Sequence, residues 1–204
     1  VSFLDTGFFL SITSNETIMK YLIIGLGYIG EEYDDTRHNI GFMALDHLTE
    51  EFDKSFKLDK LAFKSEIKYK GRSIHLIKPT TYMNLSGKSV NYWMQQLSIS
   101  KENILVLVDD IALPFANIRL RTKGSSAGHN GLKNIEDLTG GQNYSRLKIG
   151  IGNDFPKGQQ VKYVLSRFNK KEFEEMPFLL DKINKVILSF CTIGPGRTMN
   201  EFND

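Results

Sequence analysis

The sequence is poor in the residues that mark secreted or modular proteins. Cys191 is the only cysteine among 204 residues, so neither an internal disulfide nor a thiolate metal cluster can form. It lies in the apolar run "VILSFCTIG" without a nearby basic partner, which predicts a buried structural thiol. Proline is scarce, at five residues, and the chain has no repeat, low-complexity tract or Pro/Ser-rich linker. These absences favour a single domain from a reducing compartment.

Long hydrophobic runs and a large excess of one charge are absent too. No apolar stretch reaches the ~18 residues that a membrane-spanning helix needs. The net charge is only +2, so any binding of nucleic acid must depend on a local basic patch. Near the N-terminus, "FFLSI" is too short for a signal-peptide core and has no basic segment before it. We therefore expect a cytoplasmic protein with its working start at Met19, residues 1–18 being an N-terminal extension and 19–204 the domain.

Two hydrophobic periodicities alternate along that domain. Short apolar or alternating runs predict strands at 20–25, 66–71, 73–78, 104–108, 117–121 and 146–152. Apolar residues three or four positions apart predict helices after Gly41, from Ser86, from Gly131, over 161–168 and over 173–190, the last with Pro177 in its first turns. Alternating strands and helices predict a single α/β domain, with a mostly parallel twisted sheet and helices on both faces.

The stretch "GLGYIG" has the G-x-G-x-x-G spacing of a dinucleotide-binding turn, at Gly25, Gly27 and Gly30. Its surroundings do not fit that interpretation. Four carboxylates within the next five residues would repel a pyrophosphate, and the following helix begins about ten residues late. We therefore predict no dinucleotide. The glycines are expected to let the chain leave a sheet strand in a crowded conformation, at the edge where open α/β folds bind ligands.

Polar residues in the predicted loops suggest chemistry at this edge. His38 is the natural general base, and either Asp109 or Asp110, at the end of an apolar strand, is suited to orient its imidazole. Asn84 and Asn130 can hold a carbonyl group or a water molecule. Taken singly, the histidine can equally be a hydrogen-bonded structural residue, and the asparagines turn or cap residues.

Several catalytic motifs are missing. The chain has no H-E-x-x-H, and His47 and His75 fall inside a predicted helix and strand, so we expect no metal site. His129, next to Asn130, is a plausible supporting residue. No G-x-S-x-G nucleophile turn is present. A histidine–aspartate pair without metal or nucleophile suits direct attack of water on an activated ester.

Basic residues gather around the loop "GSSAGHNG". Arg121 and Lys123 precede it, Lys133 lies in the helix that follows, and Lys148 lies on a neighbouring strand. A helix N-terminus flanked by lysines can bind phosphate, although an ordinary solvated face would have the same composition.

Five blocks, "GLGYIG", "TRHNIGF", "TTYMNLSG", "LVDDIALP" and "GSSAGHNGLK", resemble in order and spacing those of the bacterial peptidyl-tRNA hydrolase family. The similarity extends over about 19–204, including "RLKIGIG", "YVLSRF" and "RTMNEFN". It implies a monomeric carboxylic ester hydrolase without cofactor, whose partner is peptidyl-tRNA and which frees the peptide from the tRNA 3′ ribose.

The resemblance also assigns roles to individual residues. It selects Asp109 as the orienter and makes Asn84, Asn130, Tyr33 and Tyr82 substrate contacts, the tyrosines being able to stack on the terminal adenine. It assigns the basic residues Arg121, Lys123, Lys133 and Lys148 to the acceptor-stem phosphates.

One position departs from the family pattern. Tyr28 stands where the family has an asparagine credited with distinguishing N-blocked peptidyl-tRNA from free aminoacyl-tRNA. The departure leaves open a non-enzymatic RNA-binding protein of the same fold, like the plant chloroplast intron-splicing factor that resembles these hydrolases. A dinucleotide oxidoreductase is the remaining alternative.

Overall fold

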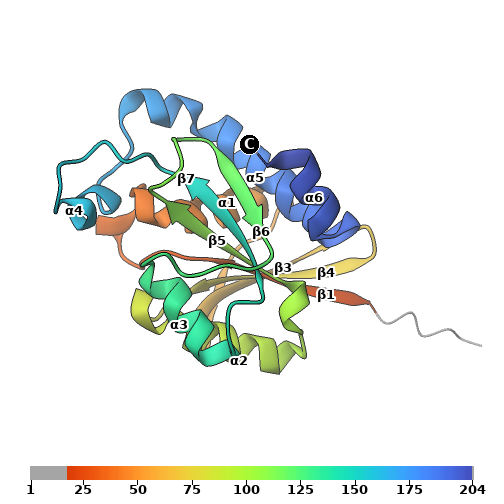
Figure 1. The fold of residues 1–204 in the computed structure, drawn as a ribbon. Helices are drawn as coiled ribbons and strands as arrows, with labels where there is room; N and C mark the ends of the chain where they lie inside the picture. The colour runs from red at the N-terminus through yellow and green to blue at the C-terminus, as the bar shows by residue number, and fades with distance from the viewer. Residues whose placement is uncertain (1–17, 204) are drawn as a thin grey trace, which may run out of the picture.

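The computed structural model describes residues 18–203, so all of the predicted N-terminal extension except Ile18 lies outside the described residues. One seven-stranded sheet organises these residues, in the order β2-β3-β4-β1-β5-β7-β6 (Figure 1). The strands are β1 (Met19–Gly25), β2 (Lys57–Asp59), β3 (Ala62–Tyr69), β4 (Arg72–Pro79), β5 (Ile104–Asp110), β6 (Ile118–Arg121) and β7 (Ser145–Gly150). The α-helices are α1 (Ile40–Glu51), α2 (Ser86–Leu97), α3 (Asn130–Thr139), α4 (Gln160–Val164), α5 (Lys170–Ile193) and α6 (Pro195–Phe202).

The sheet is mixed, with a parallel centre. β1 pairs in parallel with β4 and with β5, and β5 pairs in parallel with β7. The antiparallel pairs lie toward the edges, where β3 joins β2 to β4 and β6 joins β7. The α/β class is therefore confirmed, and the predicted hairpin around Lys70-Gly71 is the β3–β4 pair. Because β1 and β5 are interior strands covered on both faces, their residues form continuous apolar runs.

Helices cover both faces of the sheet. α1, α5 and α6 lie on one face and α2 and α3 on the other (Figure 1). Each face has its own apolar core. In β1, Ile23 packs in the cluster beneath α1 and α5, whereas Leu22 and Ile24 pack in the cluster beneath α2 and α3. Cys191 of α5 is fully buried, as predicted, and burial raises the pKa of its thiol far above the usual range.

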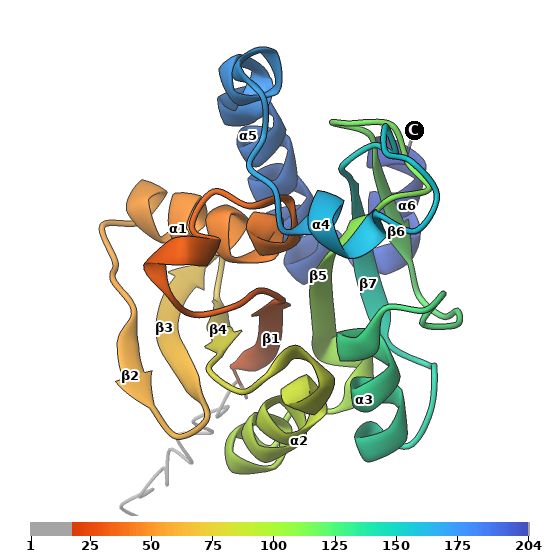
Figure 2. The same cartoon turned by 90° about the vertical axis from the view of Figure 1, so that its left-hand side faces the viewer.

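Four predicted helices are found, but the one expected over 161–168 is shorter. α4 has only five residues and ends at Val164, because the chain beyond it turns to pair with the segment before α1. Arg37 N–H donates to the Ser166 carbonyl, and Thr36 forms an isolated β-bridge with Arg167. Phe168 is buried outside the helix, whereas Val161 stays 72% exposed. Figure 2 shows α4 beside the ends of β5 and β7.

Candidate active site

The glycines of "GLGYIG" allow two backbones to approach each other closely at the carboxyl end of β1. A Cβ on Gly25 would lie 2.4 Å from the Gly41 carbonyl oxygen, and one on Gly41 would lie 2.6 Å from the Leu26 oxygen. Side chains at either position would separate the strand from the start of α1. After Gly30 the chain forms only two short 3₁₀ helices, η1 (Glu31–Tyr33) and η2 (Arg37–Asn39), before α1 begins at Ile40. The glycines therefore bring the turn that carries His38 to the end of the sheet, and no α-helix begins directly after Gly30, where a pyrophosphate would bind.

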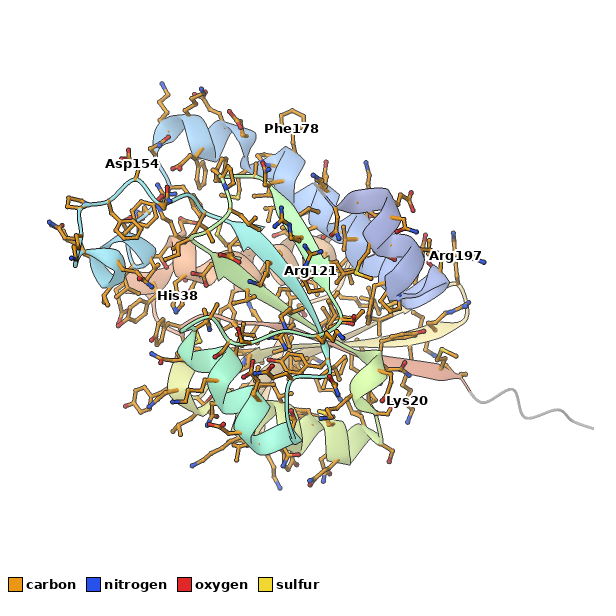
Figure 3. The ribbon with its side chains drawn as sticks, in the orientation of Figure 1. Lys20, His38, Arg121, Asp154, Phe178 and Arg197 are labelled. Atoms are coloured by element: carbon orange, nitrogen blue, oxygen red, sulfur yellow. The ribbon has the colours of Figure 1, made fainter. Side chains whose placement is uncertain are left out.

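His38 lies in the 3₁₀ helix η2 (Arg37–Asn39) and faces the carboxyl end of β5. Its Nδ1 is 2.8 Å from Oδ1 of Asp109, and the two side chains are only 12% and 4% exposed. A carboxylate accepts a hydrogen bond, so Nδ1 carries the proton and Nε2 keeps its lone pair. This is the tautomer that a general base requires. Figure 3 shows where His38 lies relative to α3 and α4.

Asp109, and not its neighbour, contacts His38. Asp110 is engaged elsewhere: its Oδ2 accepts a hydrogen bond from Lys148 at 2.9 Å, and its Oδ1 accepts one from the Ala112 N–H at 2.8 Å. Of the two carboxylates that the residues alone left open, the structure therefore places Asp109 against His38, and Asp109 is the one that the family resemblance selected.

His129 contacts the same carboxylate oxygen of Asp109. His129 is the N-cap of α3, and its Nδ1 accepts a hydrogen bond from the Leu132 N–H. The ring proton is therefore on Nε2, which lies 3.3 Å from Asp109 Oδ1. Burial would raise the pKa of Asp109, but the charge of His38 and hydrogen bonds from both histidines outweigh it and hold the pKa well below its usual range. Asp109 therefore remains a carboxylate at neutral pH, with two imidazole donors on one oxygen.

His38, Asp109 and His129 are also the set in the described residues whose ligand atoms lie close enough together, within 4.8 Å, to hold a metal ion. The hydrogen bonds do not suit that use. A metal on Nε2 of His129 would place the ring proton on Nδ1, opposite the Leu132 N–H, and so abolish the helix cap. The arrangement is better suited to proton transfer than to metal binding. Away from it, His47 pairs with Asp181 at 2.7 Å, and His75 is buried in β4.

A cavity of about 230 Å³ opens beside His38. Its polar lining comes mainly from β5 and β7, from η2 and from the start of α3, and an apolar wall comes from the α4 segment. The lining includes Tyr28, His38, Asp109, His129, Asn130, Lys148, Gln160, Val161, Val164 and Leu165. Val161, exposed at the surface, is thus an apolar residue that faces the cavity.

Tyr28 and Tyr33 form a row of rings with the two histidines. The Tyr28 ring centroid lies 5.0 Å from that of Tyr33 and 5.5 Å from that of His38, which is 5.1 Å from His129. Burial raises the pKa of Tyr28, helped by Tyr33 and by the charge of Asp109, so its phenol stays protonated.

Asn39 fixes the backbone of Tyr28. Its side-chain oxygen accepts the Tyr28 N–H at 2.7 Å, and its amide donates to the Tyr28 carbonyl at 2.9 Å. Although Asn39 occupies the N-cap position of α1, its side chain makes no capping bond there. This contact is not predictable from the sequence, because an asparagine before a helix normally indicates a cap.

The remaining predicted residues are only partly brought together. Asn130 lines the cavity, whereas Tyr82, 75% exposed, and Asn84, also exposed, stand outside its lining. Arg121, Lys123 and Lys148 line a second hollow of about 320 Å³ together with Asp110. Lys133 lies exposed on α3, apart from both hollows. Figure 3 labels Arg121, the last residue of the edge strand β6.

Fold and site together define an α/β protein with a histidine–aspartate pair suited to general acid–base catalysis. The chain belongs to the peptidyl-tRNA hydrolase family, whose model matches residues 22–204, as the five sequence blocks predicted. No helix among residues 18–203 is long and apolar enough to cross a membrane.

Individual relatives agree. The chain is 57% identical to a peptidyl-tRNA hydrolase of Cytophaga hutchinsonii over 91% of its own length and 98% of the relative's. It is 52% identical to one of Bacteroides fragilis, over 91% and 99%. The crystal structure of peptidyl-tRNA hydrolase from Acinetobacter baumannii superimposes with a TM-score of 0.84 at 33% identity, covering 90% of this chain and 94% of that one.

Proposed function

We propose that this chain hydrolyses the ester between a peptide and the 3′ ribose of tRNA, with His38 as the general base. The observation that carries the proposal is the contact of His38 Nδ1 with the buried Asp109 carboxylate at 2.8 Å, beside an open cavity. Nε2 of His38 takes a proton from water as the water attacks the ester carbonyl. The ester bond then breaks, and the imidazolium returns the proton to the leaving ribose oxygen. Asp109 stabilises the imidazolium in between.

Substrate contacts follow from the lining of the cavity. Asn130, at the N-terminus of α3, is suited to hold the carbonyl oxygen, where the partial positive charge of the helix end adds to its amide. Tyr33 and Tyr82 offer rings for the terminal adenine and Asn84 an amide, although all three stand outside the cavity lining and would meet only a substrate that extends beyond the cavity. Arg121, Lys123 and Lys148 gather at the second hollow, which suits acceptor-stem phosphates, with Lys133 further along α3.

The rival function is tRNA binding without hydrolysis. The departure at Tyr28 favours it, because a half-buried ring beside His38 occupies space where the family has an amide. The intact histidine–aspartate contact favours the enzyme. The rate of hydrolysis of N-acetyl-aminoacyl-tRNA, measured for the wild-type chain and for His38→Ala, distinguishes the two functions. An enzyme hydrolyses the ester and slows when its base is removed, whereas a tRNA-binding protein hydrolyses it with neither sequence. We further propose that the protein acts as a cytoplasmic monomer, which size-exclusion chromatography with light scattering tests.

A further inference from the structure

Arg37, directly before His38, is buried, and the proposed reaction assigns it no role. It is only 5% exposed, and a buried guanidinium is stable only with a close partner. That partner is Glu172, in the first turn of α5. Its carboxylate accepts one hydrogen bond from Arg37 Nη1 at 2.8 Å and another from Nη2 at 2.6 Å. Two parallel charged hydrogen bonds of this kind fix direction as well as distance.

The other contacts of Arg37 belong to the same part of the chain. Nη1 also donates to the Ile151 carbonyl at 3.1 Å, and the guanidinium lies between the rings of Tyr163 and Phe168, 4.5 and 4.9 Å from their centroids. Its backbone N–H donates to the Ser166 carbonyl at 3.0 Å. All of these partners lie between residues 151 and 172. This segment includes α4, the apolar wall of the cavity.

The partners are themselves connected. The Tyr163 hydroxyl donates to the same Ile151 carbonyl at 2.7 Å. Glu172 closes a capping box with Asn169, so one of its oxygens accepts both from Arg37 and from the Asn169 N–H, the latter at 2.8 Å. The guanidinium thus joins the end of β7, α4 and the start of α5 at one point.

We propose that Arg37 is a positioning residue, which holds His38 in register with the α4 wall of the cavity. η2 is a three-residue turn with no side-chain cap of its own, so anchoring one residue of it restrains the next. The Arg37–Glu172 pair fixes this turn and the α4 segment to one another. The distance between the base and a substrate resting on α4 is then set by Arg37, which is not itself part of the cavity lining. This inference rests on the proposed function.

Substitutions of graded severity test it. Arg37→Met removes both the fork and the charge, and we expect kcat/KM for N-acetyl-aminoacyl-tRNA to fall about 10- to 100-fold, because a misplacement near 1 Å can cost about 10²-fold. Arg37→Lys keeps the charge but cannot form the paired hydrogen bonds, so its kcat/KM should lie between those of the wild type and of Arg37→Met. Glu172→Gln weakens the same pair by removing the charge of the partner. The double variant Arg37→Met/Glu172→Gln should lose little more kcat/KM than Arg37→Met alone, since both substitutions remove the same contact.

Asn184→Ala supplies the matched control. Asn184 is also buried and ties α5 to α1 through Glu51 at 2.8 Å, so its loss should lower the melting temperature while kcat/KM stays within about twofold. The second readout is the imidazole Cε1–H resonance of His38, assigned with His38→Ala. It should shift in both Arg37 variants and in Glu172→Gln, and stay in place in Asn184→Ala.

A loss of kcat/KM without a shift of the resonance, or a shift without a loss, would overturn the proposal. If Arg37→Met does not fold, the same two readouts on Glu172→Gln decide. If the wild-type chain itself does not cleave the ester, the proposed function fails, and the resonance alone then shows whether Arg37 positions His38.

Discussion

Tyr28 gives the sharpest test of how the site selects its substrate. Asn39 holds the backbone of residue 28 at both its N–H and its carbonyl, so a substitution there changes the side chain without releasing the turn. Tyr28→Asn removes a ring that packs between Tyr33 and His38 and restores an amide donor and acceptor. We expect the variant to cleave N-blocked substrate faster and to reject free aminoacyl-tRNA more sharply.

The expected size follows from the contacts. One hydrogen bond gained to the acylated end of the substrate is worth about 0.5–1.5 kcal/mol, which corresponds to a roughly 2- to 13-fold change in kcat/KM. Each ring pair lost is worth about 0.5–1.5 kcal/mol, so the variant should also be less stable, with a lower melting temperature.

Tyr28→Phe is the control, because it keeps the ring and removes only the hydroxyl. The assay is kcat/KM for N-acetyl-aminoacyl-tRNA and for free aminoacyl-tRNA, on all three proteins. If Phe, Tyr and Asn at position 28 give the same ratio of the two constants, the position takes no part in selection and the reasoning is refuted.

Three other results are expected. Asp109→Asn should slow hydrolysis about 10²- to 10⁴-fold and move the acid limb of the pH–rate profile to lower pH, because the His38 imidazolium loses its counter-charge at 2.8 Å. An acid limb that does not move would show that Asp109 does not stabilise the imidazolium. Affinity for tRNA should fall as salt rises, and Arg121→Ala should reduce the log–log slope by about 1; an unchanged slope would make the basic hollow a merely solvated face. Cys191, with its pKa raised by burial, should resist a thiol reagent at pH 8 in the native protein and react in denaturant, whereas rapid native reaction would contradict the buried position.

The sequence predicted those elements whose hydrophobic period reflects packing in the final fold. β5, which is apolar without interruption from Ile104 to Val108, and α2, with Val90 and Trp93 on its buried face, are examples. α4 was overestimated because Val161 and Phe168 were assigned to one helical face, although one faces the cavity and the other the core. Strand order was beyond prediction, since the pairing of β5 with β7 joins segments far apart in the chain.

The site shows the same division. His38 was a candidate because it lies in a polar loop that faces an acidic strand end, and the structure places it against Asp109, the carboxylate that the family blocks selected. Arg37 was not, since an arginine in "TRHN" normally indicates a solvated loop. Its partners stand 114 and 135 positions away, so its burial follows from tertiary structure alone. His129 was predicted only as a supporting residue, because its capping role depends on where α3 begins.

The most direct test of the central claim is single-turnover hydrolysis of N-acetyl-aminoacyl-tRNA by His38→Ala. We expect a rate about 10²- to 10⁴-fold below wild type, the usual contribution of a general base, with the affinity for tRNA nearly unchanged. Hydrolysis by the variant at close to the wild-type rate would contradict His38 as the base that activates water.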